Sequence, residues 1–168
     1  MRILHISKYY SPYLGGVENI CKYLVEGTTK HETAVVCFND KCKDVVDEVN
    51  GHKVYRVATW MNVARQALSL SYFWVRPDVI QFHWANPFPA WVLLCVIPKN
   101  VKLIIHWHMD IIKQKRIYPL IKPVETALLK RADLVCVTSP QYRDGSIPLQ
   151  PFKDKVRIVQ NAMDEDNF

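Results

Sequence analysis

The chain has 168 residues, of which 49% are hydrophobic and 23% are charged. These proportions are those of a globular domain with a substantial core, and they exclude disorder over most of the length. The net charge of +6 favours anionic partners such as phosphates, nucleic acid or an acidic membrane surface, without choosing among them.

The cysteines and the short apolar segments indicate the compartment. The number of cysteines is odd and no C-x-x-C pair occurs, so we expect mostly reduced, buried thiols (Cys21, Cys37, Cys42, Cys95 and Cys136). We therefore expect a reducing, cytoplasmic location. The apolar stretch at the N-terminus is too short for a signal peptide, and residues 91–98 are too few to cross a bilayer. The protein is predicted to be soluble or peripheral.

Short β-rich segments alternate with longer helical ones along the whole chain. Several of the β-rich segments are continuous apolar runs, which is typical of parallel strands covered by helices on both faces. The predicted strands are residues 2–7, 33–38, 52–57, 78–83, 102–107, 133–138 and 155–159.

The segments between these strands are predicted to be helices. The first carries an apolar stripe at helical spacing (Val17, Ile20, Cys21, Leu24 and Val25). Further helices are predicted over residues 62–75, 89–97 and 118–131, the last becoming regular near Pro123. Ser139, followed by Pro140, is predicted to cap a short fifth helix.

This alternation predicts the α/β class, with a Rossmann-like, doubly wound, mainly parallel sheet flanked by helices. Ligands of such sheets bind at the carboxyl ends of the strands, near the point where the strand order reverses. Candidate functional residues are therefore those at the strand ends.

Gly15 and Gly16 follow the first strand, at the mouth of the first helix. Glycines there let the backbone approach a ligand, and free N–H groups at a helix N-terminus favour phosphate. The spacing is neither G-x-G-x-x-G nor that of a P-loop, so a dinucleotide fingerprint is excluded. A tight turn without a ligand is the alternative interpretation.

The fifth predicted strand ends in H-W-H-M-D, which contains His106, His108 and Asp110. Both histidines point to the same side of a strand, where an imidazole could shuttle a proton or contact a sugar hydroxyl. Two histidines and a carboxylate could also bind a metal ion, although H-x-H alone is weak evidence for one. Packed or solvated histidines without function are the alternative.

The fourth predicted strand ends in His83, and Asn86 follows three residues later. A functional role and a packing role are equally open for His83. Asn86 precedes a proline and is predicted to cap the next helix.

Basic side chains gather after the fifth strand (Lys113, Lys115, Arg116, Lys122, Lys130 and Arg131), with aromatic residues at Phe73, Trp74 and Tyr118. Such a surface could contact anionic lipid headgroups or an acidic acceptor. A solvated helix face is the alternative. No zinc-type cysteine pair is present in the sequence, and no RNA-binding aromatic motif supports a nucleic-acid partner.

The order of these motifs resembles one known family. The chain reads P-x-x-G-G-x-E after the first strand, then D-V-I-x-F-H-x-x-N-P, H-x-H-x-D-I, R-A-D-L-V-x-V-T-S-P-x-Y and K-V-R-I-V-x-N-A-M-D. In this order the motifs resemble the N-terminal domain of the family 4, or group 1, glycosyltransferases of the GT-B type. The resemblance covers nearly the whole chain.

The resemblance implies one half of a GT-B fold, in which two Rossmann-like domains face a cleft. Residues 1–160 would form the acceptor-side domain, and residues 161–168 would begin the hinge to a C-terminal domain that binds the nucleotide sugar. The hinge motif usually has glycine where this chain has Ala162. The chain would by itself be an inactive fragment.

The resemblance also implies a reaction: a sugar passes with retention from a nucleotide-sugar donor to a glycan or lipid-linked acceptor, in cell-surface polysaccharide synthesis. Gly15 and Gly16 would approach the donor diphosphate, and His108 would lie near the reacting sugar. His83, His106, Asp110 and Lys113 are the further candidates on the acceptor or sugar side, with His106 standing where many relatives have threonine. No cofactor or metal is expected, and the enzyme could associate with the inner face of the membrane.

Three other functions stay open. A GT-B epimerase acting on UDP-N-acetylglucosamine shares the architecture but would leave the basic face unexplained. A non-catalytic Rossmann-like domain could bind a phosphorylated ligand or a partner protein. Charge alone would suggest a nucleic-acid binder, for which no recognition motif is present.

Overall fold

The computed structural model describes residues 1–59, 61–63, 66–68, 76–84, 86–111 and 116–161. The strands in these ranges are β1 (Arg2–Ile6), β2 (Glu32–Phe38), β3 (Val45–Val49), β4 (His52–Val57), β5 (Met61–Val63), β6 (Gln66–Leu68), β7 (Val79–Trp84), β8 (Lys102–Trp107), β9 (Leu134–Val137) and β10 (Val156–Ile158). The helices are α1 (Gly16–Gly27), α2 (Pro87–Val96), α3 (Tyr118–Arg131), α4 (Pro140–Gly145) and the 3₁₀ segment η1 (Ile147–Lys155).

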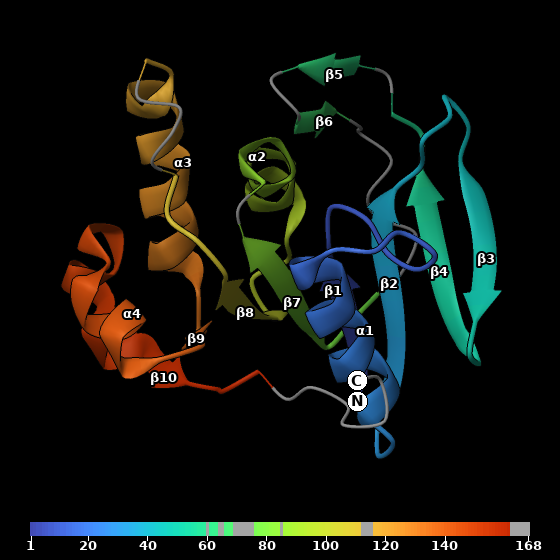
Figure 1. Ribbon diagram of the computed structural model, residues 1–168, viewed down its shortest axis with the longest axis horizontal. Helices are drawn as coiled ribbons and strands as arrows, with labels where there is room; N and C mark the ends of the chain where they lie inside the picture. The colour runs from blue at the N-terminus through green and yellow to red at the C-terminus, as the bar shows by residue number, and fades with distance from the viewer. Residues whose placement is uncertain (60, 64–65, 69–75, 85, 112–115, 162–168) are drawn as a thin grey trace.

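The main sheet has the strand order β10-β9-β8-β7-β1-β2-β4-β3 and is parallel except for the edge strand β3 (Figure 1). From β1 the chain first builds outward to β2 and β4, and then returns to place β7 on the other side of β1. The strand order therefore reverses between β1 and β7, which is where a doubly wound sheet binds its ligand. The predicted fold class is confirmed.

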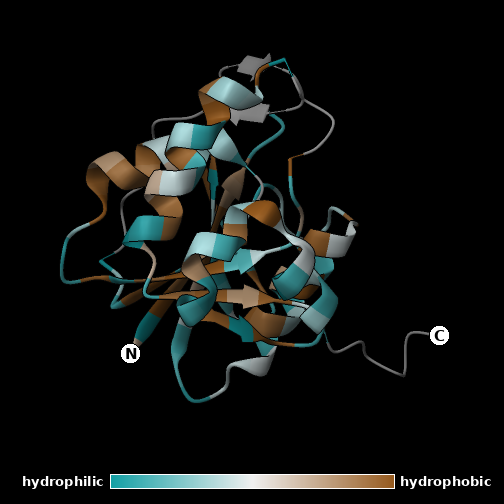
Figure 2. Ribbon diagram, turned by 90° about the vertical axis from the view of Figure 1, so that its left-hand side faces the viewer, coloured by the Kyte–Doolittle hydropathy of each residue, from teal (hydrophilic) through white to brown (hydrophobic). Residues whose placement is uncertain are grey.

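Each face of the sheet has its own apolar core. The larger core joins alternate strand residues such as Phe82 and Ile105 to Leu93 of α2 and Leu128 of α3. The smaller core lies on the opposite face, where α1 contributes Cys21 and Val25. Figure 2 shows hydrophobic and hydrophilic residues alternating along the helices that surround the sheet. This arrangement follows because successive side chains of a strand point to opposite faces of the sheet, and because α1 presents one apolar stripe to the sheet.

The tryptophans of β7 and β8 show how tightly the larger core is packed. Trp84 and Trp107 are neighbours in register and stack with their ring centroids 5.1 Å apart, both with 0% exposure. Because successive residues of a strand point to opposite faces, this stack sends the histidine preceding each tryptophan to the other face.

Strand β3 was not predicted. It pairs with β4 in an antiparallel hairpin whose turn is Asn50-Gly51, with φ of 50° and 81°. Two successive residues with positive φ are the conformation that Asn-Gly favours in two-residue hairpins. The dipeptide was therefore a usable signal in the sequence.

The helix predicted over residues 62–75 is wrong where the structure describes it, because β5 and β6 form a two-stranded antiparallel sheet. Short apolar segments fit a hairpin as well as a helix, so periodicity alone does not separate them. The rest of that prediction, residues 69–75, lies outside the described residues. Helix α3 begins at Tyr118 rather than near Pro123, which lies inside it.

Candidate active site

Three neighbouring strands bring histidines together at the point where the strand order reverses. His5 lies on β1, His83 on β7 and His106 on β8, where His83 and His106 are partners in register. Their side chains share the face opposite the tryptophan stack, and His108 follows just beyond β8. Parallel strands end at the same edge of the sheet, which is why residues far apart in sequence meet here.

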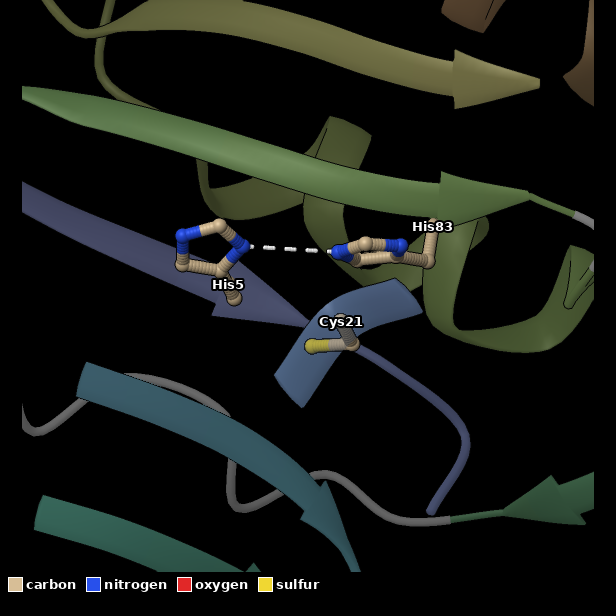
Figure 3. A group of neighbouring side chains, drawn as sticks. All are labelled: His5, Cys21 and His83. Carbon is tan, nitrogen blue, oxygen red and sulfur yellow. Dashed lines mark hydrogen bonds between the residues drawn. The ribbon is translucent and has the colours of Figure 1, made fainter. Parts of the chain in front are cut away.

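The four imidazoles contact one another directly. His5 Nδ1 lies 3.4 Å from His83 Nε2, and His83 Nδ1 lies 3.0 Å from His108 Nε2. His106 stacks on His108 with ring centroids 4.3 Å apart and also lies 3.5 Å from Gln81 Nε2 through its own Nδ1. Figure 3 shows the rings of His5 and His83 facing each other across their strands, with Cys21 of α1 beside them.

Burial makes the cluster electrically neutral. The side chains of His5, His83 and His106 are 1%, 2% and 1% exposed. Burial lowers the pKa of His5 and of His106 to about 4, and burial with nearby His106 lowers the pKa of His108 to about 3. Burial and the three surrounding imidazoles hold the pKa of His83 well below its ordinary value. At neutral pH each ring therefore carries one hydrogen and one free lone pair.

Two overlapping groups have the donor atoms of a metal site. One consists of His5, Cys21 and His83, and the other of His83, His106 and His108, with the donor atoms of each group within 4.8 Å of one another. Burial raises the pKa of the Cys21 thiol, which disfavours the thiolate that binds metal. An ion would also have to displace the contacts that the imidazoles make with each other.

Asp110 holds the segment that carries His108. Its Oδ1 accepts hydrogen bonds of 2.8 Å from the Trp107 indole and from the Ser146 hydroxyl. Its backbone N–H donates to the Tyr142 hydroxyl at 2.7 Å. The chain just after β8 is thereby tied to α4 and to the segment that follows α4, which fixes where His108 emerges from the strand.

The glycine pair forms the N-terminus of α1. Gly15 is the N-cap, in extended conformation and without a side-chain cap, and Gly16 is the first helical residue. A Cβ atom on Gly15 would lie 2.2 Å from Glu18 Oε2, whereas one on Gly16 would have nothing within 4 Å. The carboxylate of Glu18 thus lies against the helix N-terminus, where the helix dipole favours negative charge. Cys21, which reaches the histidines, lies about 8 Å further along the helix axis.

Arg56 of β4 fixes the loop that precedes the glycine pair. Its guanidinium is buried, pairs with Asp47 of β3 at 2.5 Å and donates to the Ser11 carbonyl at 2.5 Å. Tyr9 and Tyr13 of the same loop stack with ring centroids 5.0 Å apart. The loop between β1 and α1 is therefore tied to the opposite half of the sheet.

The structure brings together three of the predicted residues, namely His83, His106 and His108, while Lys113 lies outside the described residues. Asn86 is the N-cap of α2, which confirms its predicted position, although its side chain makes no cap bond to the described residues. The cap at Ser139 is confirmed, since its Oγ accepts a bond from the Tyr142 amide at 3.1 Å.

The sequence interpretation missed His5, Gln81, Tyr142 and Ser146. For His5 a signal existed, because it is a histidine in the strand that a doubly wound sheet places at its centre.

The predicted basic surface is only partly described. Lys122 and Lys130 of α3 are exposed and line a surface cavity of about 370 Å³ with Pro119, Pro123, Thr126 and Ala127. Arg131 instead holds the Pro98 and Val101 carbonyls and Asp133. Large apolar side chains are also exposed on these helices, with Trp91 of α2 at 62% and Leu120 of α3 at 77%. None of the helices in the described ranges has both the length and the apolar character that crossing a membrane requires.

The cysteines of the described residues are all free. Cys21, Cys37 and Cys136 are buried as expected, whereas Cys42 and Cys95 are exposed. The apolar sequence around Cys95 suggested burial, but Cys95 lies on the outer side of α2.

Comparison with known proteins decides the family. The model of Glycosyltransferase Family 4 matches residues 14–167. The chain belongs to this family. A D-rhamnosyltransferase of Pseudomonas aeruginosa is 28% identical over the whole chain, which covers 46% of that protein. The O-antigen chain mannosyltransferase C of Escherichia coli is 26% identical over 98% of the chain, and this match covers 47% of the mannosyltransferase.

The family's fold is also found among solved structures. Sucrose-phosphate synthase from Thermosynechococcus elongatus matches 95% of the chain with a TM-score of 0.69 at 17% identity, and the match covers 47% of that protein. This family 4 chain thus spans about half the length of the curated relatives that it matches. The expected half of a GT-B fold is confirmed.

Proposed function

We propose that the chain forms the acceptor-side domain of a glycosyltransferase. The enzyme would transfer a sugar, with retention of configuration, from a nucleotide-sugar donor to a glycan or glycolipid acceptor in the synthesis of a cell-surface polysaccharide. The observation that carries the proposal is the position of His108, which family resemblance assigns to the reacting sugar and which lies at the reversal point of the sheet. The names of the two curated relatives support a polysaccharide product.

Two charges develop during sugar transfer, one on the leaving diphosphate and one on the donor sugar, and different residues would act on each. As the donor diphosphate leaves, the backbone N–H groups at the N-terminus of α1, at Gly15 and Gly16, would stabilise its negative charge. His108 would hold the donor sugar while positive charge develops at its anomeric carbon. Because its pKa is lowered to about 3, His108 is neutral at working pH and would not repel that charge.

The test uses the full-length protein that contains this chain, incubated with radiolabelled nucleotide-linked hexoses and deoxyhexoses and with a lipid-linked saccharide extract. Label should enter the saccharide, and adding EDTA should not lower the rate of incorporation. The His108→Ala substitution should lower that rate about 100-fold or more. The exposed His31→Ala is the matched control and should leave the rate unchanged. Near-normal transfer by a folded His108→Ala protein would remove this residue from the site.

The same proposal places the enzyme at an anionic membrane surface through α2 and α3. These helices pack side by side, and between them they expose Trp91 and Leu120 as well as Lys122 and Lys130. Apolar side chains that enter a bilayer interface beside lysines that attract anionic headgroups are typical of peripheral binding.

Sedimentation with vesicles tests the membrane contact. The chain should bind vesicles rich in phosphatidylglycerol and not pure phosphatidylcholine vesicles. Replacing both lysines by glutamine should weaken binding by roughly 2 kcal/mol, at about 1 kcal/mol for each charge near the surface. Equal binding to both kinds of vesicle, or to neither, would contradict the proposal. Binding to random oligonucleotides is not expected.

A further inference from the structure

Both ring nitrogens of His83 are engaged by other histidines. Nε2 faces His5 at 3.4 Å and Nδ1 faces His108 at 3.0 Å, so the three rings form a hydrogen-bonded line, which we call the imidazole series. A neutral imidazole has one N–H donor and one acceptor nitrogen. If His83 donates on one side it must accept on the other, and the hydrogen bonds therefore run in one direction through the series.

Only two directions are available, and they differ at the ends of the series. In the first, His5 donates from Nδ1 to His83, and His83 donates from Nδ1 to His108 Nε2. In the second, every bond is reversed, and His5 must then carry its hydrogen on Nε2. That atom is fully buried and has no hydrogen-bond partner among the residues that the structure describes.

The buried end at His5 favours the first direction. An N–H group buried without an acceptor is rarer in native proteins than an acceptor buried without a donor. The first direction leaves only a bare lone pair at His5 Nε2, whereas the second would bury an orphaned N–H group there. In the first direction, the hydrogen of His108 must lie on Nδ1, the nitrogen that faces away from His83.

We propose that His83 and His5 are positioning residues that hold His108 in its Nδ1–H tautomer, so that His108 donates a hydrogen bond to the donor sugar and does not act as a base. The assignment of a sugar to His108 rests on the proposed function, but the tautomer does not. The Nε2 lone pair of His108 is taken by His83, and Nδ1 already carries a hydrogen. No nitrogen of His108 is then left to accept a substrate proton.

The surroundings of His108 hold the ring in this orientation. His106 stacks on it with an interplanar angle of 18°, and His83 lies nearly parallel to it at 11°. The anchored carboxylate of Asp110, two residues further on, fixes the backbone. A protonated ring at this position would lie against two other imidazoles in a buried site, which disfavours charge on any of them.

The tautomers can be observed in the chain alone, without a substrate. Long-range ¹H–¹⁵N correlation spectra of the uniformly ¹⁵N-labelled chain at pH 7.5 distinguish protonated from bare ring nitrogens, and the chain has six histidines to assign. His5, His83 and His108 should all be protonated on Nδ1, the minor tautomer of histidine in water. A predominantly Nε2–H His108 in the folded chain would overturn the proposal.

Two substitutions of His83 separate positioning from packing. The side-chain amide of His83→Asn places an N–H donor near the position of Nδ1, so His108 should keep its Nδ1–H tautomer. His83→Leu fills a similar volume without a donor, and His108 should then shift mainly to Nε2–H. If His108 stays in the Nδ1–H form in His83→Leu, His83 does not position it. Should the leucine variant fail to fold, the wild-type and asparagine spectra still decide.

Failure here is distinguishable from failure of the proposed function. A series with the opposite direction would overturn the assignment of His108 as a donor while leaving the transfer assay unaffected. Absence of transfer in the full-length enzyme would leave the tautomer pattern intact. The exposed His31→Gln is the matched control, since it should remove one set of histidine signals and leave those of His108 unchanged.

Discussion

Acid should destabilise this domain over the pH range in which the unfolded chain binds more protons than the folded chain. In an unfolded chain a histidine protonates near pH 6.5, whereas burial lowers the folded-state pKa of His5 and of His106 to about 4. Between these values the unfolded state binds more protons, so its free energy falls relative to the folded state. Stability that is fully present above about pH 6.5 is therefore lost progressively down to about pH 4.

The size of the effect follows from the two pKa values. Going from pH 7 to pH 5, one histidine with an unfolded pKa of 6.5 and a folded pKa of 4 reduces the free energy of unfolding by about 2 kcal/mol. His5 and His106 together would remove about 4 kcal/mol, a large share of the roughly 5–15 kcal/mol that stabilises a typical domain. His83 and His108 act in the same direction, because their pKa values are also lowered.

Urea unfolding followed by tryptophan fluorescence at pH 7, 6 and 5 measures this loss. His106→Leu is the informative variant, since it removes one titrating group from the cluster and should lessen the slope by about 1.4 kcal/mol per pH unit. A free energy of unfolding that stays constant from pH 7 to pH 5 would refute the claim that these imidazoles are neutral and buried in the folded chain.

Three further substitutions test the parts around the histidines. Gly16→Ala should leave the urea midpoint of unfolding unchanged or slightly raised, because an added Cβ atom there meets nothing within 4 Å. The same substitution should weaken the binding of UDP or GDP to the full-length protein, measured by calorimetry. Gly27→Ala, at the other end of α1, is the control and should not affect nucleotide binding. Asp110→Asn should cost about 1–2 kcal/mol in urea unfolding, because the Trp107 and Ser146 donors lose a charged acceptor. Arg56→Met should cost about 2 kcal/mol in the same assay by releasing Asp47 and the Ser11 carbonyl, and an unchanged midpoint would contradict that role.

The parts of the fold that could be predicted are those in which one local pattern decides the outcome. Largely apolar runs such as β7 and β8 are typical of buried parallel strands, and the stripe of α1 has helical spacing. The hairpin of β5 and β6 was not predictable in this way, because a short apolar segment takes its structure from its neighbours. The Asn50-Gly51 turn was predictable, and the signal was overlooked.

In the candidate site too, residues selected by a local rule could be predicted, and roles that depend on distant contacts could not. His83, His106 and His108 stand at strand ends, and the rule that ligands bind there was sufficient to select them. The roles of Asp110 and His5 depend on contacts across 36 and 78 positions of sequence, which no local pattern contains. Asp110 was predicted as a contact to the sugar or acceptor, and its carboxylate is found between the indole and hydroxyl donors that hold the chain after β8.

One consequence of the sheet topology connects these observations. Because the strand order reverses between β1 and β7, the histidines of these two strands lie side by side, while α1 covers them from the same face. The helix that closes over the imidazole series also begins at the glycine pair, so the proposed diphosphate-binding end of α1 and His108 belong to one packed unit. A shift of α1 would therefore move the proposed diphosphate contact and the support of His108 together. The two halves of the proposed reaction, departure of the diphosphate and orientation of the sugar, would then both depend on how α1 packs on the sheet through Cys21 and Val25.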